Sequence, residues 1–166
     1  NLHGMPVSAL TGLMPQYGRK PVLSLKHLIY FGIRSYEPEE FKMIQKHRIP
    51  WYDSRVCHPD RIPEIKREVD NYFFPDGKKD PYWISFDIDG VDKSEFASTG
   101  TPEGQGISLA FMMKFLEAFI PESVGMDFTE VNFLQSDEDQ AEIDMLTVRL
   151  IIERIVQTVH HHNHRK

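Results

Sequence analysis

Only one cysteine, Cys57, occurs among the 166 residues of the chain. A single thiol excludes an internal disulfide, and such sparing use of cysteine favours a reducing compartment. Because reactive thiols need special surroundings that lower their pKa, we interpret Cys57 as an inert residue near a loop.

The chain also lacks a long apolar run and an excess of positive charge. No stretch approaches the roughly 20 apolar residues that cross a bilayer, so no membrane partner is predicted. The formal charge of −6 argues against a nucleic-acid partner held by bulk electrostatics. With 40% hydrophobic and 27% charged residues, the composition is that of an ordinary globular protein, and we expect residues 1–166 to form a single domain.

Short apolar runs alternate with helical patterns along the chain. Strands are predicted at 28–33, 49–54, 82–87 and 123–134, and helices at 37–46, 62–73, 108–120 and 136–160. In the last helix, the apolar residues expected on one side are Ile143, Leu146, Leu150, Ile151 and Ile155. Such alternation predicts an α/β fold, a parallel sheet flanked by helices on both faces.

Three acids, Asp87, Asp89 and Asp92, end the apolar strand segment in the sequence SFDIDGVD. A buried carboxylate is costly unless it has a cation partner or faces solvent. Residues two apart in an extended segment point the same way, so Asp87 and Asp89 can converge on one hard cation. Parallel sheets carry their functional residues just past the strand ends, where Glu37 and Glu130 are also expected.

From these residues alone, three interpretations stay open: a metal site, a plain turn or an aspartyl nucleophile. Asp and Gly are routine turn residues. The stretch DIDG also resembles the haloacid-dehalogenase phosphohydrolases, in which Asp87 would accept the phosphoryl group, although no convincing downstream lysine and acidic motif follow. An EF-hand is excluded, because counting from Asp87 puts Asp92 where Gly is needed and Ser98 where Glu is needed.

The surrounding motifs favour the metal site. In chain order they are NLHGMPVSALTG, GIRSYEPEE, SFDIDGVD with FASTGTPEGQG directly after it, and GMDFTEVNFL. Together they resemble the ureohydrolases, most closely the arginases, over nearly the whole chain. The resemblance implies the C-terminal portion of a three-layer αβα catalytic domain that is incomplete at its N-terminal side.

The resemblance also implies a binuclear manganese centre. Asp87 would bridge two Mn(II) ions, and Asp89 would bind one of them and take part in catalysis. His3 would be the proton shuttle, and Glu130 would pair with the guanidinium of the substrate. The residue types suit this chemistry, because a metal pair brings the pKa of water toward neutrality and hard Mn(II) prefers carboxylate oxygens.

The same resemblance implies a set of substrate contacts. Asn1 would help to hold the carboxylate of L-arginine, and Glu37 would lie near its α-amino group. Glu40 would be a further acid in contact with the substrate, Thr101 would form part of the pocket wall, and Glu130 would bind the guanidinium through charge-assisted hydrogen bonds.

Each of these residues has a simpler alternative interpretation. His3 would ordinarily be a solvated histidine, and Glu130 an acid at a strand end. Glu37 and Glu40 would be acids of a helix first turn, where they complement the helix dipole. The terminal HHHNHRK is interpreted as a polar helix end and tail rather than as a metal site.

The chain departs from the family in one respect that bears on activity. The family's metal pair is also held by Gly-Gly-Asp-His and Asp-Ala-His-x-Asp segments, and neither occurs here. We therefore expect the full-length parent to hydrolyse L-arginine to L-ornithine and urea, and this chain alone to be inactive. The alternatives are an agmatinase, the phosphohydrolase, or a non-catalytic subunit.

Assembly and compartment are expectations from the resemblance as well. The full-length protein is expected to be a homo-oligomer, a trimer or a hexamer, that acts on a small molecule. The cytoplasm is the expected compartment, with mitochondria as the alternative if a targeting segment lies upstream of Asn1.

Overall fold

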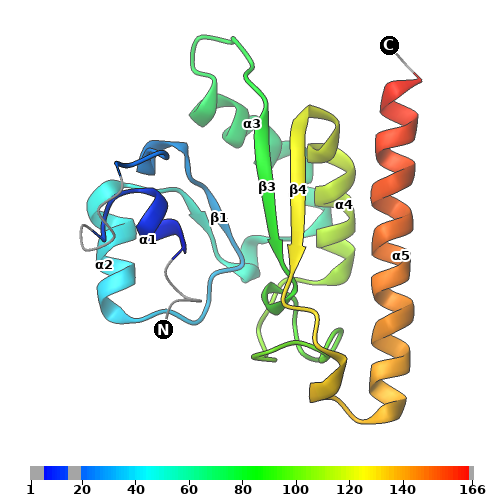
Figure 1. Cartoon of the computed structure of the whole chain (residues 1–166). Helices are drawn as coiled ribbons and strands as arrows, with labels where there is room; N and C mark the ends of the chain where they lie inside the picture. The colour runs from blue at the N-terminus through cyan, green and yellow to red at the C-terminus, as the bar shows by residue number, and fades with distance from the viewer. Residues whose placement is uncertain (1–5, 15–19, 165–166) are drawn as a thin grey trace. The chain divides into compact units, whose positions relative to one another are not determined.

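The structure is a computed structural model that describes residues 6–14 and 20–164 (Figure 1). It divides into two compact units. The first comprises Asn1–Tyr30 and Ser35–Trp51, and the second comprises Phe31–Arg34 and Tyr52–Lys166. The prediction of a single domain stays a prediction.

The first unit is mainly helical. It contains α1 (Pro6–Leu10), the short 3₁₀ helix η3 (Leu25–His27) and α2 (Pro38–His47). Helix α2 begins with a capping box, in which the side chains of Glu37 and Glu40 each accept a hydrogen bond from the other's backbone amide. It ends at Arg48, which has a left-handed φ of 53°.

Strands β1 (Tyr30–Phe31) and β2 (Trp51–Tyr52) form a two-stranded sheet. Both are shorter than the predicted strands at 28–33 and 49–54. Gly32 takes a φ of 71° directly after β1, a conformation that ends an extended strand. A Cβ at Gly32 would lie 2.9 Å from Cγ2 of Ile107, so the close packing there also requires glycine.

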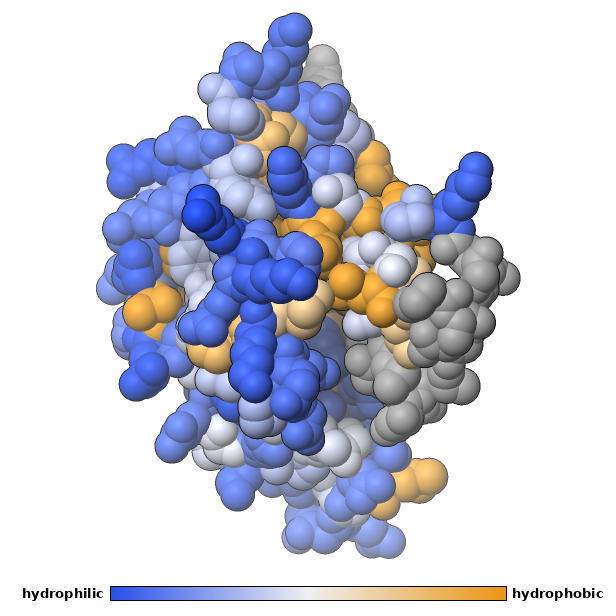
Figure 2. All heavy atoms as spheres, turned by 90° about the vertical axis from the view of Figure 1, so that its left-hand side faces the viewer, coloured by the Kyte–Doolittle hydropathy of each residue, from blue (hydrophilic) through white to orange (hydrophobic). Residues whose placement is uncertain are grey.

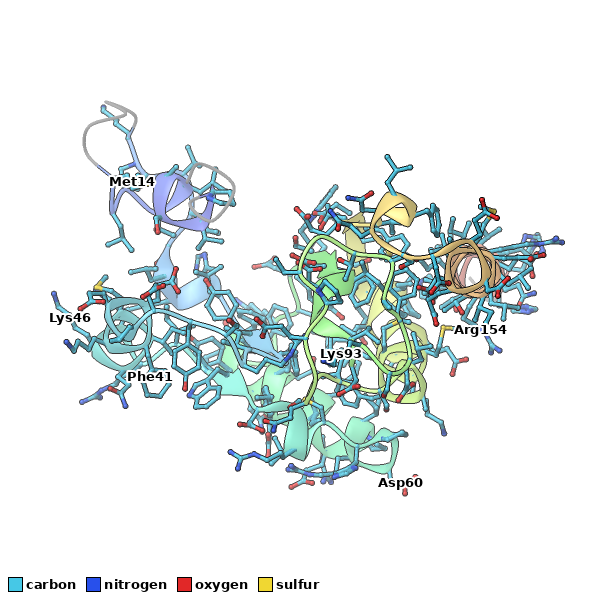
Figure 3. All side chains as sticks on the ribbon, turned by 90° about the horizontal axis from the view of Figure 1, so that it is seen from below. Met14, Phe41, Lys46, Asp60, Lys93 and Arg154 are labelled. Atoms are coloured by element: carbon cyan, nitrogen blue, oxygen red, sulfur yellow. The ribbon has the colours of Figure 1, made fainter. Side chains whose placement is uncertain are left out.

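The second unit is built on two parallel strands, β3 (Tyr82–Asp87) and β4 (Ser123–Thr129). Its α-helices are α3 (Ile62–Phe73), α4 (Leu109–Phe119) and α5 (Glu138–Asn163), and its 3₁₀ helices are η4 (Ser54–Val56), η5 (Pro59–Arg61), η6 (Ile88–Gly90), η7 (Ile120–Glu122) and η8 (Phe133–Gln135). Figures 1 and 3 show α3 and α4 on one side of the strand pair and α5 beside α4. The opposite face of β3, which carries Trp83 and Ser85, is exposed.

The core of this unit lies between the strands and the helices. Its most deeply buried apolar side chains come from α3, α4, α5 and the loop after β3: Ile65, Ile88, Val91, Phe96, Phe111, Met112, Leu116 and Ile151. Cys57 is 3% exposed, and burial raises its thiol pKa to about 11. Burial and the raised pKa support the interpretation of Cys57 as an inert thiol.

The predicted α/β fold with parallel strands and packed helices is confirmed. The prediction of helices on both faces is not met within the described second unit, because one face of β3 is covered by helices and the other is exposed. Helix α3 and strand β3 have the predicted bounds, whereas β4 ends five residues earlier than predicted, at Thr129 rather than at residue 134. The strand stops there because Glu130 adopts a left-handed φ of 67°.

The apolar side predicted for α5 is wrong in part. Ile143, Leu146 and Leu150 are exposed by 57%, 57% and 60%, whereas Asp144 and Ile151 are buried. The helix therefore turns a carboxylate toward the core and leaves part of its apolar surface uncovered.

In the parts of the chain that the structure describes, no helix is both long enough and apolar enough to cross a bilayer. Figure 2 shows mostly hydrophilic side chains on the face it presents, with a smaller group of hydrophobic ones among them.

Replacing a core leucine tests the packing of α4. Leu116 is fully buried, so Leu116→Ala should lower the free energy of unfolding by about 2–5 kcal/mol through lost burial and the cavity left behind. Leu134 is 96% exposed, and Leu134→Ala should change it by less than about 0.5 kcal/mol. Urea unfolding followed by circular dichroism measures both, and equal effects would contradict the described core.

Candidate active site

The carboxyl ends of β3 and β4 bring two of the predicted site residues to one edge of the sheet. Asp87 is the last residue of β3 and pairs in register with Thr129, the last residue of β4, which precedes Glu130. Figure 3 looks along the strands from this end, and the loop that carries Lys93 lies in front of the strand ends. This is the edge at which parallel sheets hold their functional groups.

Asp87 and Asp89 belong to a turn and not to one extended strand. The Asp87 side chain caps η6 by accepting a hydrogen bond of 2.9 Å from the Asp89 amide. The two carboxylates are therefore not brought together by the alternation of side chains along a strand. The turn brings them together, and it leaves the Asp89 side chain free to face the loop that follows.

Asp89 is held by two threonines of the STGTP segment. Thr101 donates its hydroxyl to Oδ2 of Asp89 at 2.7 Å and its amide to Oδ1 at 3.3 Å. The Thr99 hydroxyl also lies within hydrogen-bonding distance of Oδ1. Both carboxylate oxygens thus have fixed donors, and the orientation of the side chain is set by the loop.

Glu130 has a strained backbone next to the same loop. Its φ of 67° is uncommon for a residue other than glycine, and such strain is found most often at functional sites. Its carbonyl oxygen lies 2.9 Å from the Thr99 hydroxyl. A Cβ at Gly100 would lie 3.3 Å from Oε2 of Glu130, so the carboxylate approaches the loop at the point where the loop has no side chain.

The pKa of the Asp87 carboxyl depends on both neighbouring acids. Burial raises the pKa of its carboxyl, and the charges of Asp89 and Glu130 raise it further. The hydrogen bond from the Asp89 amide and the Arg34 guanidinium act in the opposite direction. Among the described residues, no ion pair includes Asp87, Asp89 or Glu130. The three carboxylates form a group of like charge that a cation would stabilise.

Arg34 braces the loops around this group, a role that the sequence analysis missed. Its guanidinium donates to the carbonyl oxygens of Asp89 at 2.6 Å, Glu103 at 3.1 Å and Gly104 at 3.1 Å. The only sequence signal was its place directly after a predicted strand, in GIRS. A side chain with five donors in a fixed fork suits such a cluster of carbonyls.

Asp92, the third acid of SFDIDGVD, forms its hydrogen bonds within the loop that follows. It accepts hydrogen bonds from the Ser94 hydroxyl at 2.6 Å, the Ser94 amide at 2.9 Å and the Gly106 amide at 3.1 Å. These bonds, those from Ser94 first, lower its pKa to about 2.

The remaining predicted site residues lie in different parts of the chain. Asn1 and His3 lie outside the described residues. Glu37 and Glu40 lie in the first unit, where they form the capping box of α2. Thr101, predicted in the pocket wall, is a hydrogen-bond partner of Asp89. Their roles in substrate binding stay predictions.

The residues present fit part of a metal site. Carboxylate oxygens such as those of Asp87 and Asp89 suit a hard divalent cation. Within residues 6–14 and 20–164, however, no cluster of three or more His, Cys, Asp or Glu side chains is arranged to hold a metal ion. The described chain therefore offers two acidic ligands and not a complete coordination shell.

Comparison with known proteins defines the class. The model of the Arginase family matches residues 1–156, so the chain belongs to the arginase family, a family of amidine hydrolases. Its relatives include Arginase-1 of Bos taurus, 31% identical over 80% of this chain and 44% of that protein. Mitochondrial Arginase-2 of Oryctolagus cuniculus is 32% identical over 95% of this chain and 48% of its own length.

The fold agrees with this membership. The crystal structure of Entamoeba histolytica arginase with L-ornithine superimposes with a TM-score of 0.77 and 26% identity, over 93% of this chain and 52% of that one. The chain thus spans about half the length of the relatives that it matches.

The depressed pKa of Asp92 predicts an acid-dependent loss of stability. Because the folded pKa of about 2 lies below the ordinary value of 3.8, the carboxylate stabilises the fold above about pH 4, and this contribution is lost as the pH falls toward 2. Wild type should therefore exceed Asp92→Asn in urea midpoint at pH 5 and match it at pH 2. Ser94→Ala should move the loss to higher pH. A difference that does not change with pH would contradict the assignment.

Proposed function

We propose that the chain is the C-terminal part of the catalytic domain of a manganese-dependent arginase, which hydrolyses L-arginine to L-ornithine and urea. The observation that carries the proposal is the convergence of Asp87, Asp89 and Glu130 beside the Thr99–Thr101 loop. Membership of the arginase family and arginase relatives over most of the chain support it.

Asp87 and Asp89 are the proposed metal ligands, and their carboxylate oxygens would help to hold the manganese ions. When bound, such a pair supplies the Lewis acidity that ionises water near neutral pH. The chain's own contribution is to present carboxylate oxygens in fixed orientations. The Asp89 amide orients Asp87, and the Thr101 hydroxyl and amide orient Asp89.

Glu130 is the proposed partner of the substrate guanidinium. A carboxylate can accept two parallel hydrogen bonds from a guanidinium, which fixes the plane of the reacting carbon. The left-handed backbone of Glu130 and the absence of a side chain at Gly100 support this role, because together they let the carboxylate lie against the loop that holds Asp89.

The other proposed contacts lie at the beginning of the chain and in the first unit. His3 would protonate the leaving amine, since histidine titrates in the appropriate range. Asn1 would hold the α-carboxylate, with Glu37 and Glu40 near the α-amino group. Thr101 would complete the pocket wall in addition to holding Asp89.

We further propose that this chain by itself does not catalyse the reaction. Two carboxylates without the histidine-bearing segments of the family would bind manganese weakly and would not enforce a bridged pair. The full-length protein is proposed to assemble as a trimer or hexamer. The cytoplasm is its proposed compartment, with mitochondria as the alternative.

Calorimetry with manganese tests the incomplete metal site. Titration of the chain with Mn²⁺ should give weak binding, because most of the ligands that the family uses are absent. Asp89→Asn should weaken it further, whereas Asp76→Asn, which removes the same charge from an exposed turn, should not. Tight binding of two ions per chain would contradict the partial site.

Urea release tests the reaction. The longest product of the gene that encodes this chain, loaded with manganese, should release urea from L-arginine and much less from agmatine, which lacks the carboxylate assigned to Asn1. Asp89→Asn should lower turnover by at least about 100-fold, the upper end of what loss of an outer-shell partner costs. Asp76→Asn again serves as the control.

The competing functions predict different outcomes in the same experiments. A preference for agmatine would favour an agmatinase. Trapping of a phosphoryl analogue on Asp87 would favour the dehalogenase-type phosphohydrolase. Absence of urea from either substrate in a manganese-loaded, folded protein would favour a non-catalytic relative.

A further inference from the structure

Three buried polar residues of the described chain lie in one network. They are Ser98, Thr99 and Asp144, with exposed fractions of 0%, 1% and 0%. Asp144 is on α5, more than 40 residues away in sequence from the other two. A fully buried carboxylate is costly, so its retention in the core requires compensating hydrogen bonds.

Asp144 receives three such bonds. Its Oδ2 accepts from the backbone amides of Ala97 at 3.0 Å and Ser98 at 2.7 Å. Its Oδ1 accepts from Nε2 of Gln140, one turn earlier on the same helix, at 3.0 Å. The carboxylate therefore ties α5 to the start of the STGTP segment by its backbone, independently of the side chains of that segment.

The anchored residues lead directly to the proposed catalytic acids. Ser98 accepts a hydrogen bond from the Asn132 amide at 2.8 Å through its carbonyl oxygen, which connects the loop to the segment that follows Glu130. Thr99, the next residue, lies between Asp89 and the Glu130 carbonyl oxygen. A shift of the backbone at 97–98 would therefore displace the donors of Asp89 and the support of Glu130 together.

We propose that Asp144 is a positioning residue: it sets the backbone of residues 97–101 and through it the orientation of Asp89 and Glu130. The effect of Asp144 on metal and substrate binding rests on the proposed function. The effect of Asp144 on the backbone of the loop does not.

Two substitutions at Asp144 distinguish the effect of its hydrogen bonds from the effect of its packing. Asp144→Ala removes every acceptor and leaves the amides of the part-buried Ala97 and the buried Ser98 without this partner. Asp144→Asn keeps an oxygen at the Oδ2 position, and Gln140 can rotate its amide to accept from the new NH₂ group. The asparagine variant should therefore restore the loop. Ile151→Ala is the matched control, because Ile151 is 1% exposed on the same helix and has no bond to the loop.

Amide hydrogen exchange on the full chain is the first measurement. Asp144→Ala should raise the exchange rates of residues 97–101 by about tenfold or more relative to β3 and β4, because local opening of the loop becomes easier. Ile151→Ala should change rates without selecting the loop, and Asp144→Asn should resemble wild type. Protection of 97–101 that is unchanged in Asp144→Ala, or lost equally in Ile151→Ala, would overturn the proposal.

Paramagnetic broadening by Mn²⁺ alone is the second measurement. In wild type the amides of Asp89 and Thr101 should broaden first, and Asp144→Ala should need about 10–100-fold more Mn²⁺ for the same effect, as for loss of an outer-shell partner. Ile151→Ala should keep the wild-type concentration dependence, and equal loss in both variants would overturn the positioning role. If wild type itself shows no selective broadening, the proposed metal function fails, while the exchange data still decide the role of Asp144.

Discussion

Three like charges, those of Asp87, Asp89 and Glu130, are held close together at the ends of two parallel strands. Desolvation, and then the charges of Asp89 and Glu130, raise the pKa of the Asp87 carboxyl, so the three charges destabilise one another unless a cation or hydrogen-bond donors compensate. Thr101 supplies donors to the Asp89 carboxylate, and the turn amide of Asp89 supplies one to Asp87. Thr99 lies against the backbone carbonyl of Glu130. The position of these acids depends on keeping the Thr99–Thr101 loop in place.

The chain on both sides of the Thr99–Thr101 loop is secured by groups that do not belong to it. Arg34 ties the carbonyls of Asp89, Glu103 and Gly104 together from the segment after β1. Asp144, on α5, holds the amides of Ala97 and Ser98 directly before the loop. Because each is a multidentate charged group bonded to backbone, each fixes main-chain position more firmly than a packing contact would.

Membership of the arginase family indicates which chemistry these acids would serve. The chain covers only part of the length of its relatives, which limits what it can do alone. About half of the relatives' length is matched, and the described residues supply two carboxylates toward the proposed metal centre. An acid that binds a metal ion contributes to catalysis only when the other ligands of that ion are also present. The proposal therefore combines fixed site residues with a chain that is inactive by itself.

By itself the sequence determined the local elements and the chemistry at their ends. Helical spacing at 62–73 and the apolar run at 82–87 defined α3 and β3 correctly, since both patterns depend on neighbours in the chain. The acids at the end of that run, together with the flanking motifs, indicated the family. Tertiary structure alone decided which groups hold those acids. Thr101 meets Asp89 across 12 residues, and Asp144 meets Ala97 across 47. The buried side of α5 was mispredicted for the same reason: a carboxylate is stable in a core only when distant amides converge on it, and no local pattern encodes that convergence.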